Sequence, residues 1–160
     1  MNDRFEVLKK IVCEKLRSAS NGQVDLAILH LYGVSILCSL IAMKRGLNAE
    51  ICKSAGILHD LWLFLNMPLS PAEHAKHGMY GSDEARELLK SMGAYTDIEI
   101  DTICTMIDRH NEKNVIDDEY DEVLKDADAL QHYLNNSEYD KKYRYNERQI
   151  KVLDEFGVAK

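Results

Sequence analysis

The stretch DLAILHLYGVSILCSLIAMKRGLNAEICKSAGILHDLWLF, residues 25–64, decides the fold class. It consists of two apolar segments, and Gly46 stands where the first of them should end. Glycine often follows a helix, because it adopts the left-handed backbone conformation at little steric cost. The stretch therefore predicts one helix over about 25–45 and another over about 49–64, with Asn48 as the cap of the second.

The rest of the chain shows the same helical spacing of apolar residues. Both prolines, Pro68 and Pro71, fall within residues 66–82, together with Gly78 and Gly81. That segment is therefore expected to be a loop with at most one irregular helical turn. The sequence predicts an all-α fold, a compact single-domain helical bundle of about six to seven helices. Beyond the two helices above, helices are expected over about 3–18, 82–92, 97–110, 118–134 and 137–156.

Charge and composition argue against a nucleic-acid-binding protein and against a disordered chain. Twenty Lys and Arg face 27 Asp and Glu, and the formal net charge of -7 disfavours a nucleic acid as a stable partner. The exception is the basic run Lys141-Lys142-Tyr143-Arg144, for which a solvated helix face is favoured over a phosphate-binding role. With 46% apolar and 29% charged residues, the chain has the composition of a folded globular domain.

The sequence is that expected of a cytoplasmic protein. The polar amino terminus shows no signal-peptide pattern, so secretion is not expected. The most apolar stretch, 26–43, is interrupted by His30, Ser35 and Ser39, which favours a buried helix over a membrane span. The four cysteines show no metal-finger spacing and are expected to be buried, reduced thiols. They are Cys13, Cys38, Cys52 and Cys104.

Ionisable residues interrupt three of the apolar segments. His30 follows Leu26-Ala27-Ile28-Leu29, His59-Asp60 follows Ala55-Gly56-Ile57-Leu58, and Asp128 lies between two alanines. A single histidine of this kind is more often a hydrogen-bonded core residue than a ligand. Several together point to a metal, because burying a charge is costly unless a partner compensates it, and mixed nitrogen and oxygen donors suit a divalent ion.

These residues resemble the HD superfamily, named for an adjacent His-Asp pair and defined by the order H…HD…D. Here the order is His30, then His59-Asp60, then Ala127-Asp128-Ala-Leu. The resemblance implies an HD-type domain over 1–160, with its motif-bearing core at about 25–135 and the helices over 3–18 and 137–156 packing on it. Asp128 is chosen over Asp126 because it matches the family form, and Asp126 is left as a supporting or helix-face residue.

The resemblance implies six metal ligands. Two further segments, His77-Gly-Met-Tyr-Gly81 and Ile107-Asp-Arg-His110-Asn111, resemble relatives that carry additional histidine ligands. Gly33 departs from the many relatives that have a basic residue three positions after the first histidine. His74 is interpreted as a surface or supporting residue, and His132 as a partly exposed structural one. The implied metal ligands are His30, His59, Asp60, His77, His110 and Asp128.

The function that the resemblance implies is hydrolysis of a phosphomonoester or phosphoanhydride of a small nucleotide or related metabolite by metal-activated water. Asp60 would orient or deprotonate the water, and Lys76, Arg109 and Lys113 would hold the phosphate. One or two divalent ions are expected, with Mn, Fe, Mg, Co, Ni and Zn not distinguished. The alternatives are an HD-type diiron oxygenase and a non-catalytic, metal-binding regulatory module. No membrane partner is expected, and a homo-oligomer stays open.

Overall fold

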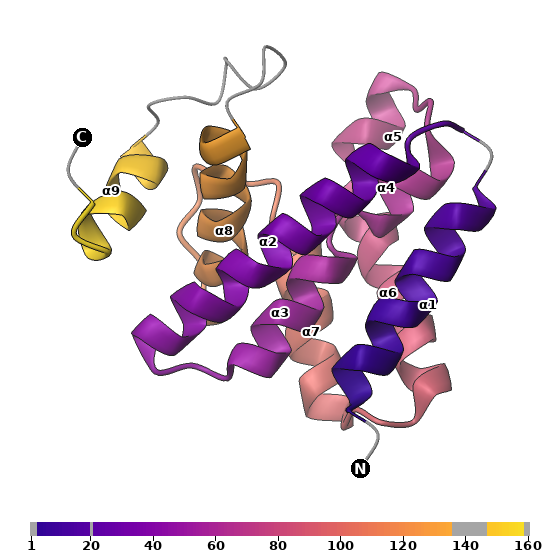
Figure 1. The fold of residues 1–160 in the computed structure, drawn as a ribbon, viewed down its shortest axis with the longest axis horizontal. Helices are drawn as coiled ribbons and strands as arrows, with labels where there is room; N and C mark the ends of the chain where they lie inside the picture. Colours follow the sequence, from indigo (N-terminus) through magenta and orange to yellow (C-terminus); the bar gives the residue numbers. More distant parts are fainter. Residues whose placement is uncertain (1–2, 20, 136–146, 159–160) are drawn as a thin grey trace.

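A computed structural model describes residues 3–19, 21–135 and 147–158, and all the regular structure in these ranges is helical (Figure 1). The helices outnumber the six to seven expected, because one expected helix is divided and the expected loop contains a short helix. The expected helix over 137–156 is seen as α9 alone, and residues 137–146, with the basic run 141–144, lie outside the described ranges. The helices are α1 (Arg4–Ser18), α2 (Val24–Arg45), α3 (Ala49–Leu58), α4 (Leu61–Asn66), α5 (Pro71–Ala75), α6 (His77–Met92), α7 (Asp97–Arg109), α8 (Glu119–Asn135) and α9 (Glu147–Glu155).

Local sequence signals set several helix ends, and Gly46 and Asn48 act as predicted. The Asp3 carboxylate accepts hydrogen bonds from the backbone N–H groups of the first turn of α1, and Asn48 does the same for α3. Thr96 and Glu99 form a reciprocal capping box at the start of α7. Gly46 ends α2 with a φ of 72°, in the left-handed region that glycine reaches without strain.

The single helix predicted over 49–64 is wrong, because the chain breaks between α3 and α4. The break lies at His59 and Asp60, and Asp60 has a φ of -111° and a ψ of 12°. Neighbouring residues on a continuous helix point about 100° apart, since one turn holds about 3.6 residues. The break gives the two side chains directions that an unbroken helix would not allow.

The expected start of a helix at Ser82 is also wrong, because α6 begins five residues earlier, at His77. Gly78 and Gly81 were interpreted as loop residues, yet both are helical and lie at close contacts between helices. A Cβ atom at Gly78 would be 2.7 Å from the backbone oxygen of Asp108, and one at Gly81 would be 3.2 Å from that of His59. These glycines allow α6 to approach α7 and the break after α3.

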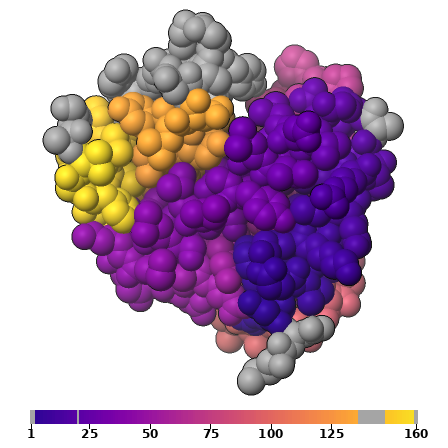
Figure 2. Space-filling view, in the orientation of Figure 1, coloured from indigo at the N-terminus to yellow at the C-terminus, as the bar shows by residue number. Residues whose placement is uncertain are grey.

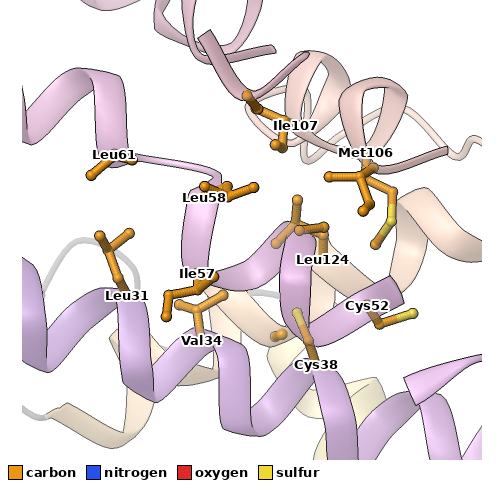
Figure 3. Close-up of a cluster of buried hydrophobic side chains, with 14 of the residues drawn as sticks. Leu31, Val34, Cys38, Cys52, Ile57, Leu58, Leu61, Met106, Ile107 and Leu124 are labelled. Carbon is orange, nitrogen blue, oxygen red and sulfur yellow. The ribbon is translucent and has the colours of Figure 1, made fainter. Parts of the chain in front are cut away.

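The core lies between α2, α3, α7 and α8. Helix α2 packs along α3, and both contact α8, while α7 packs against α6 and α3 (Figure 1). Figure 3 shows apolar side chains of all four helices meeting, among them Val34, Ile57, Met106 and Leu124. Helix α1 packs on α2, α3 and α4, and α9 packs on α8. The ionisable residues singled out above lie on or beside these core helices.

The cysteines are free, and three of the four are buried as expected. Cys13 differs, because it is only half buried and its Sγ lies 3.1 Å from the hydroxyl oxygen of Tyr32. Helix α2 is long and apolar enough to cross a membrane by length and composition, a test that core helices of soluble proteins also pass. In the structure one side of α2 is part of the core, with Leu31, Val34 and Cys38 fully buried.

Candidate metal centre

Six ionisable side chains from separate parts of the chain meet at one place. His30 comes from α2, His59 and Asp60 from the break between α3 and α4, and the rest from α6, α8 and the residue that caps α7. Five of them are buried, and the sixth, Asp60, is partly exposed. The six residues are His30, His59, Asp60, His77, His110 and Asp128.

The exposed fraction differs from residue to residue. His59 is 0% exposed, His110 1%, His77 5%, Asp128 6% and His30 7%. The Asp60 side chain is the most accessible of the six, at 14%. Five of the six residues are therefore buried, and Asp60 is partly open to the cavity described below.

The orientation of each imidazole is fixed from its Nδ1 side. The Nδ1 atoms of His59, His77 and His110 lie 2.8, 2.5 and 2.6 Å from the backbone oxygens of Gly56, His74 and Ile107, each three residues earlier in the chain. His30 Nδ1 instead lies 3.0 Å from Oε1 of Gln131 on α8. An Nδ1–H that donates to an oxygen leaves the Nε2 lone pair free, which is the arrangement usual for metal-binding histidines.

The four Nε2 atoms form two pairs. His30 Nε2 lies 3.1 Å from His59 Nε2, and His77 Nε2 lies 3.2 Å from His110 Nε2. Two imidazole lone pairs directed at each other repel unless a cation or a proton lies between them. Each pair therefore marks a position where positive charge is stabilised.

Asp60 lies between the two histidine pairs. Its Oδ2 is 3.5 Å from His30 Nε2 and 3.4 Å from His59 Nε2. Its Oδ1 is 3.0 Å from His77 Nε2 and 3.3 Å from His110 Nε2. One carboxylate thus faces both pairs, one oxygen toward each, and this arrangement suits two neighbouring metal positions.

The donor set fits a divalent cation. Among the described residues, Asp60 Oδ1 and Asp128 Oδ1 are the buried side-chain oxygens that lack a hydrogen-bond partner. An unsatisfied buried carboxylate oxygen costs free energy unless an ion compensates it. Asp128 Oδ1 lies 3.5 Å from His30 Nε2, and the ligand atoms of His30, His59 and Asp128 are all within 4.8 Å of one another. A second group with the same compactness consists of His59, Asp60 and His110.

The electrostatics of the site favour bound positive charge. Burial raises the pKa of the Asp60 carboxyl, but the surrounding imidazoles, His59 first, outweigh it and hold this pKa well below its ordinary value. The pKa of Asp128 is also held well below its ordinary value, because Lys113 and the imidazoles outweigh burial. Burial lowers the pKa of His59 to about 3. For His30 burial acts in the same direction, but Asp60 and Asp128 outweigh it and raise the pKa to about 9.

A cavity of about 550 Å³ opens onto these residues. Lys113 lines it, with Nζ 2.6 Å from Asp128 Oδ2 and 2.6 Å from the backbone oxygen of His110. The base of the cavity is polar, while its outer wall is apolar. That wall consists of Leu26, Leu29, Leu63, Phe64 and Met67.

The other two basic side chains expected to hold a substrate phosphate, those of Lys76 and Arg109, do not line the cavity. Lys76 is exposed between α5 and α6, and Arg109 binds Asp121, with Nη1 2.8 Å from Oδ2. Each is the chain neighbour of a histidine in the site, His77 or His110. Adjacent residues on a helix point in different directions, so closeness in the sequence did not bring these side chains to the cavity.

The structure separates the two acids of Asp126-Ala127-Asp128. Asp128 lies at the histidines, whereas Asp126 binds two arginines, with Oδ2 2.6 Å from Arg45 Nη2 and Oδ1 2.7 Å from Arg148 Nη1. Residues two apart on a helix lie on nearly opposite sides of it. Asp126 therefore belongs to a buried ion-pair network that joins α2, α8 and α9.

Three further residues at the site were not among the ligands expected from the sequence. His132 was interpreted as structural, yet its Nε2 lies 3.3 Å from Asp128 Oδ1 and it lines the cavity. Its spacing of four residues after Asp128 on one helix was the signal. His74 also lines the cavity, with its ring 5.2 Å from that of His77. Gln131, which contacts His30, had no signal in the sequence.

Gly33 explains how Gln131 reaches His30. A Cβ atom at Gly33 would lie 3.1 Å from Cγ of Gln131, closer than most such contacts. The glycine therefore leaves room for the glutamine side chain that orients His30. Many relatives carry a basic residue at this position. Here the glycine goes together with Gln131 on α8, whose side chain fills the space next to it.

Comparison with known proteins adds one match to this geometry. A family model described as HD domain matches residues 28–133, which is more than half of the chain and includes all six residues of the candidate centre. No solved structure matches the chain.

Proposed function

The chain belongs to the HD domain family, and on that premise we propose that it is a metal-dependent hydrolase that releases phosphate from a phosphomonoester of a small metabolite. The proposal rests on one observation above all. A carboxylate, Asp60, lies between two histidine pairs at the base of a cavity that also contains a lysine. Donors of this kind hold divalent ions, and the lysine supplies a contact for an anionic substrate.

The ligands divide between two positions. His30, His59 and Asp128 would hold one divalent ion, and His77 and His110 a second, with Asp60 between them. When bound, such ions lower the pKa of a water ligand and neutralise charge on phosphate oxygens. The identity of the metal stays open among Mn, Fe, Mg, Co, Ni and Zn.

The side chains supply binding and orientation. We assign Asp60 to the attacking water, which its carboxylate would orient and whose proton it would accept. Lys113 holds a substrate phosphate, because its ammonium lies beside the ligand set and is tied to Asp128 and the carbonyl that follows α7. The apolar outer wall excludes water and contacts the organic part of the substrate.

The lining of the cavity favours a single phosphate over a polyphosphate. Lys113 is the one lysine or arginine among the described residues that line it. A di- or triphosphate carries more negative charge, which proteins usually compensate with several cations. A volume of about 550 Å³ is within the range of small-molecule sites, so a nucleotide or a related metabolite fits.

The histidine pairs also support a second candidate, an HD-type diiron oxygenase. A centre with two imidazole-rich positions that share one carboxylate suits a pair of iron ions as well as a hydrolytic pair. The third alternative is a metal-binding regulatory module without turnover. The metal that the protein holds and the need for oxygen distinguish these functions.

The experiment is a screen of phosphorylated metabolites with the purified protein loaded with each candidate metal in turn, while metal content is measured in parallel. Released phosphate is expected from at least one monoester. In Asp60→Asn, turnover should fall more than about 100-fold, because Asp60 lies between the two metal positions. The helical circular dichroism spectrum should be unchanged. Asp97→Asn, at the exposed first turn of α7, is the control and should retain full activity.

Three outcomes would contradict the proposal. Undiminished turnover in Asp60→Asn would remove this residue from the mechanism. Product formation that requires oxygen and a stable iron pair would assign the protein to the oxygenases. A protein that binds metal but shows neither reaction would be a regulatory module.

A further inference from the structure

Helix α2 carries a stripe of exposed apolar side chains on the side opposite the core, with the partly buried Gly33 in its middle. Between 44% and 67% of the surface of each large residue in it is accessible. Figures 1 and 2 show α2 crossing the face turned to the viewer, with no other described helix lying over it. Monomeric proteins rarely expose a large contiguous apolar patch, and such patches commonly mark interaction sites. The α2 stripe consists of Leu26, Leu29, Gly33, Ile36, Leu40 and Met43.

The spacing along the α2 stripe is that of a helix-pairing seam. Successive members are 3, 4, 3, 4 and 3 residues apart, the heptad spacing by which two helices pack along each other. The sequence of intervals is the same in both directions. The stripe therefore superimposes on itself when the helix is reversed about the point midway between Val34 and Ser35, as a twofold axis there would require.

From this symmetry we propose that the α2 stripe is the interface of a homodimer, in which the α2 helices of two copies pack antiparallel about a twofold axis. In this register Leu26 of one copy packs against Met43 of the other, and Leu29 against Leu40. The central layer places Ile36 of one copy against Gly33 of the other, beside the Gln131 side chain that fills the space next to this glycine. Leu26, Leu29, Leu40 and Met43 thereby each have a large apolar partner.

The charges at the two ends of α2 favour the antiparallel orientation. Asp25 is exposed beside one end of the stripe and Lys44 beside the other. An antiparallel pair brings the acidic end of one helix to the same level as the basic end of the other, whereas a parallel pair brings like charges together. The helix dipoles act in the same direction. These contributions are small in energy and select the orientation of the pair.

The same charges argue against a membrane as the occupant of the stripe. Helices that lie on membranes usually carry several Lys and Arg residues beside the apolar face. Lys44 and Arg45 are the basic residues of α2, and Arg45 is engaged by Asp126 and Glu155. The chain as a whole has a net charge of -7. Attraction to an anionic lipid surface is therefore weak.

The dimer would also extend the cavity. Leu26 and Leu29 belong both to the α2 stripe and to the apolar outer wall. Antiparallel packing places Met43 and Leu40 of the second copy beside them. The second copy would thus add to the wall that contacts the organic part of a substrate, although the dimer itself does not depend on the proposed hydrolase activity.

The oligomeric state is measured by sedimentation over a range of concentrations. We expect a dimer for the unaltered chain, and for Ile36→Glu a dissociation constant raised at least about 100-fold, because symmetry introduces each charge twice into the interface. The matched control is Ile98→Glu on α7, where the isoleucine is 79% exposed and lies outside the stripe. It should leave the dimer unchanged. Metal content and circular dichroism should be the same in both variants.

Cross-linking tests the orientation of the two helices. In a Cys13→Ser background, the double variant Leu29→Cys/Leu40→Cys should form an intermolecular disulfide, whereas neither single variant should. Within one helix the two positions are about 16 Å apart, too far for an internal bond. Three results would overturn the proposal: a monomer at all concentrations, a dimer that Ile36→Glu leaves intact, or efficient cross-linking of both single variants. Binding of a monomeric protein to lipid vesicles that Ile36→Glu abolishes would also overturn it, in favour of a membrane surface.

Discussion

His30 Nε2 lies 3.1 Å from His59 Nε2, although the two residues are 29 positions apart in the chain. Nδ1 of His30 faces Gln131 and that of His59 faces a backbone carbonyl, so both Nε2 lone pairs are directed into the same space. The same relationship holds for His77 and His110. Two such pairs with one carboxylate between them lead to predictions for the metal count, the support of the ligands and the stability of the fold.

The first prediction concerns the second metal position. His77→Ala and His110→Ala should each weaken or remove the second binding step, while the first ion stays on His30, His59 and Asp128. Phosphohydrolase activity should fall without complete loss of metal. Titration calorimetry with metal analysis measures the stoichiometry. His74→Ala, which alters the cavity wall beside His77, is the control, and unchanged stoichiometry in both ligand variants would indicate a mononuclear centre.

The second prediction concerns Gln131, which positions His30. Gln131→Leu should lower metal affinity about 10- to 100-fold, because the hydrogen bond that orients the imidazole is lost. Gln131→Glu retains an acceptor for Nδ1–H and should keep metal affinity close to that of the unaltered protein. Competition with a coloured chelator gives the affinities. Equal affinities in the leucine and glutamate variants would show that the contact does not support the ligand.

The third prediction separates the two acids of α8. Asp126→Asn should destabilise the fold by about 3 kcal/mol, because two arginines lose a buried carboxylate partner, but metal stoichiometry should be kept. Asp128→Asn should do the reverse, lowering metal binding with a smaller effect on unfolding of the metal-free protein. Chemical denaturation and metal analysis are carried out on both variants. If Asp126→Asn lost metal while remaining fully folded, the assignment of the two acids would be exchanged.

The fourth prediction concerns pH and a site far from the metal centre. Arg4 bonds to Glu99, with Nη2 2.7 Å from Oε1, and this contact lowers the pKa of the Glu99 carboxyl from 4.5 to about 2. A carboxyl whose pKa is lower in the folded state stabilises the fold above its unfolded pKa, and the contribution is lost as the pH falls. The stability difference between the unaltered protein and Arg4→Met should be constant above about pH 5 and shrink toward pH 2.

Denaturation in the presence of a chelator measures this difference without a contribution from metal release. Lys9→Met is the control, because Lys9 pairs with the exposed Glu6 and should contribute little at any pH. A difference for Arg4→Met that does not change between pH 5 and pH 2 would contradict the role of the Glu99 ion pair.

Much of the secondary structure could be predicted from local signals. The helix ends at Asp3, Gly46 and Thr96 depend on hydrogen bonds and backbone preferences within a few residues, so the sequence was sufficient to locate them. Prediction failed where tertiary contacts override local preference. From the sequence, Gly78 was expected in a loop. In the structure it is helical, and the nearby backbone oxygen of Asp108 leaves no space for a side chain there.

The sequence by itself determined the all-α class, the family pattern of histidines and acids, and their placement in apolar segments, because helical periodicity and burial are encoded by the spacing of residue types. Only the tertiary structure decided which side chains meet. It placed Lys113 at the cavity and Arg109 on Asp121, and it separated Asp128 from Asp126. Spacing along the chain specifies the face of a helix on which a residue lies. Which other helix that face meets depends on packing between elements that are distant in the sequence.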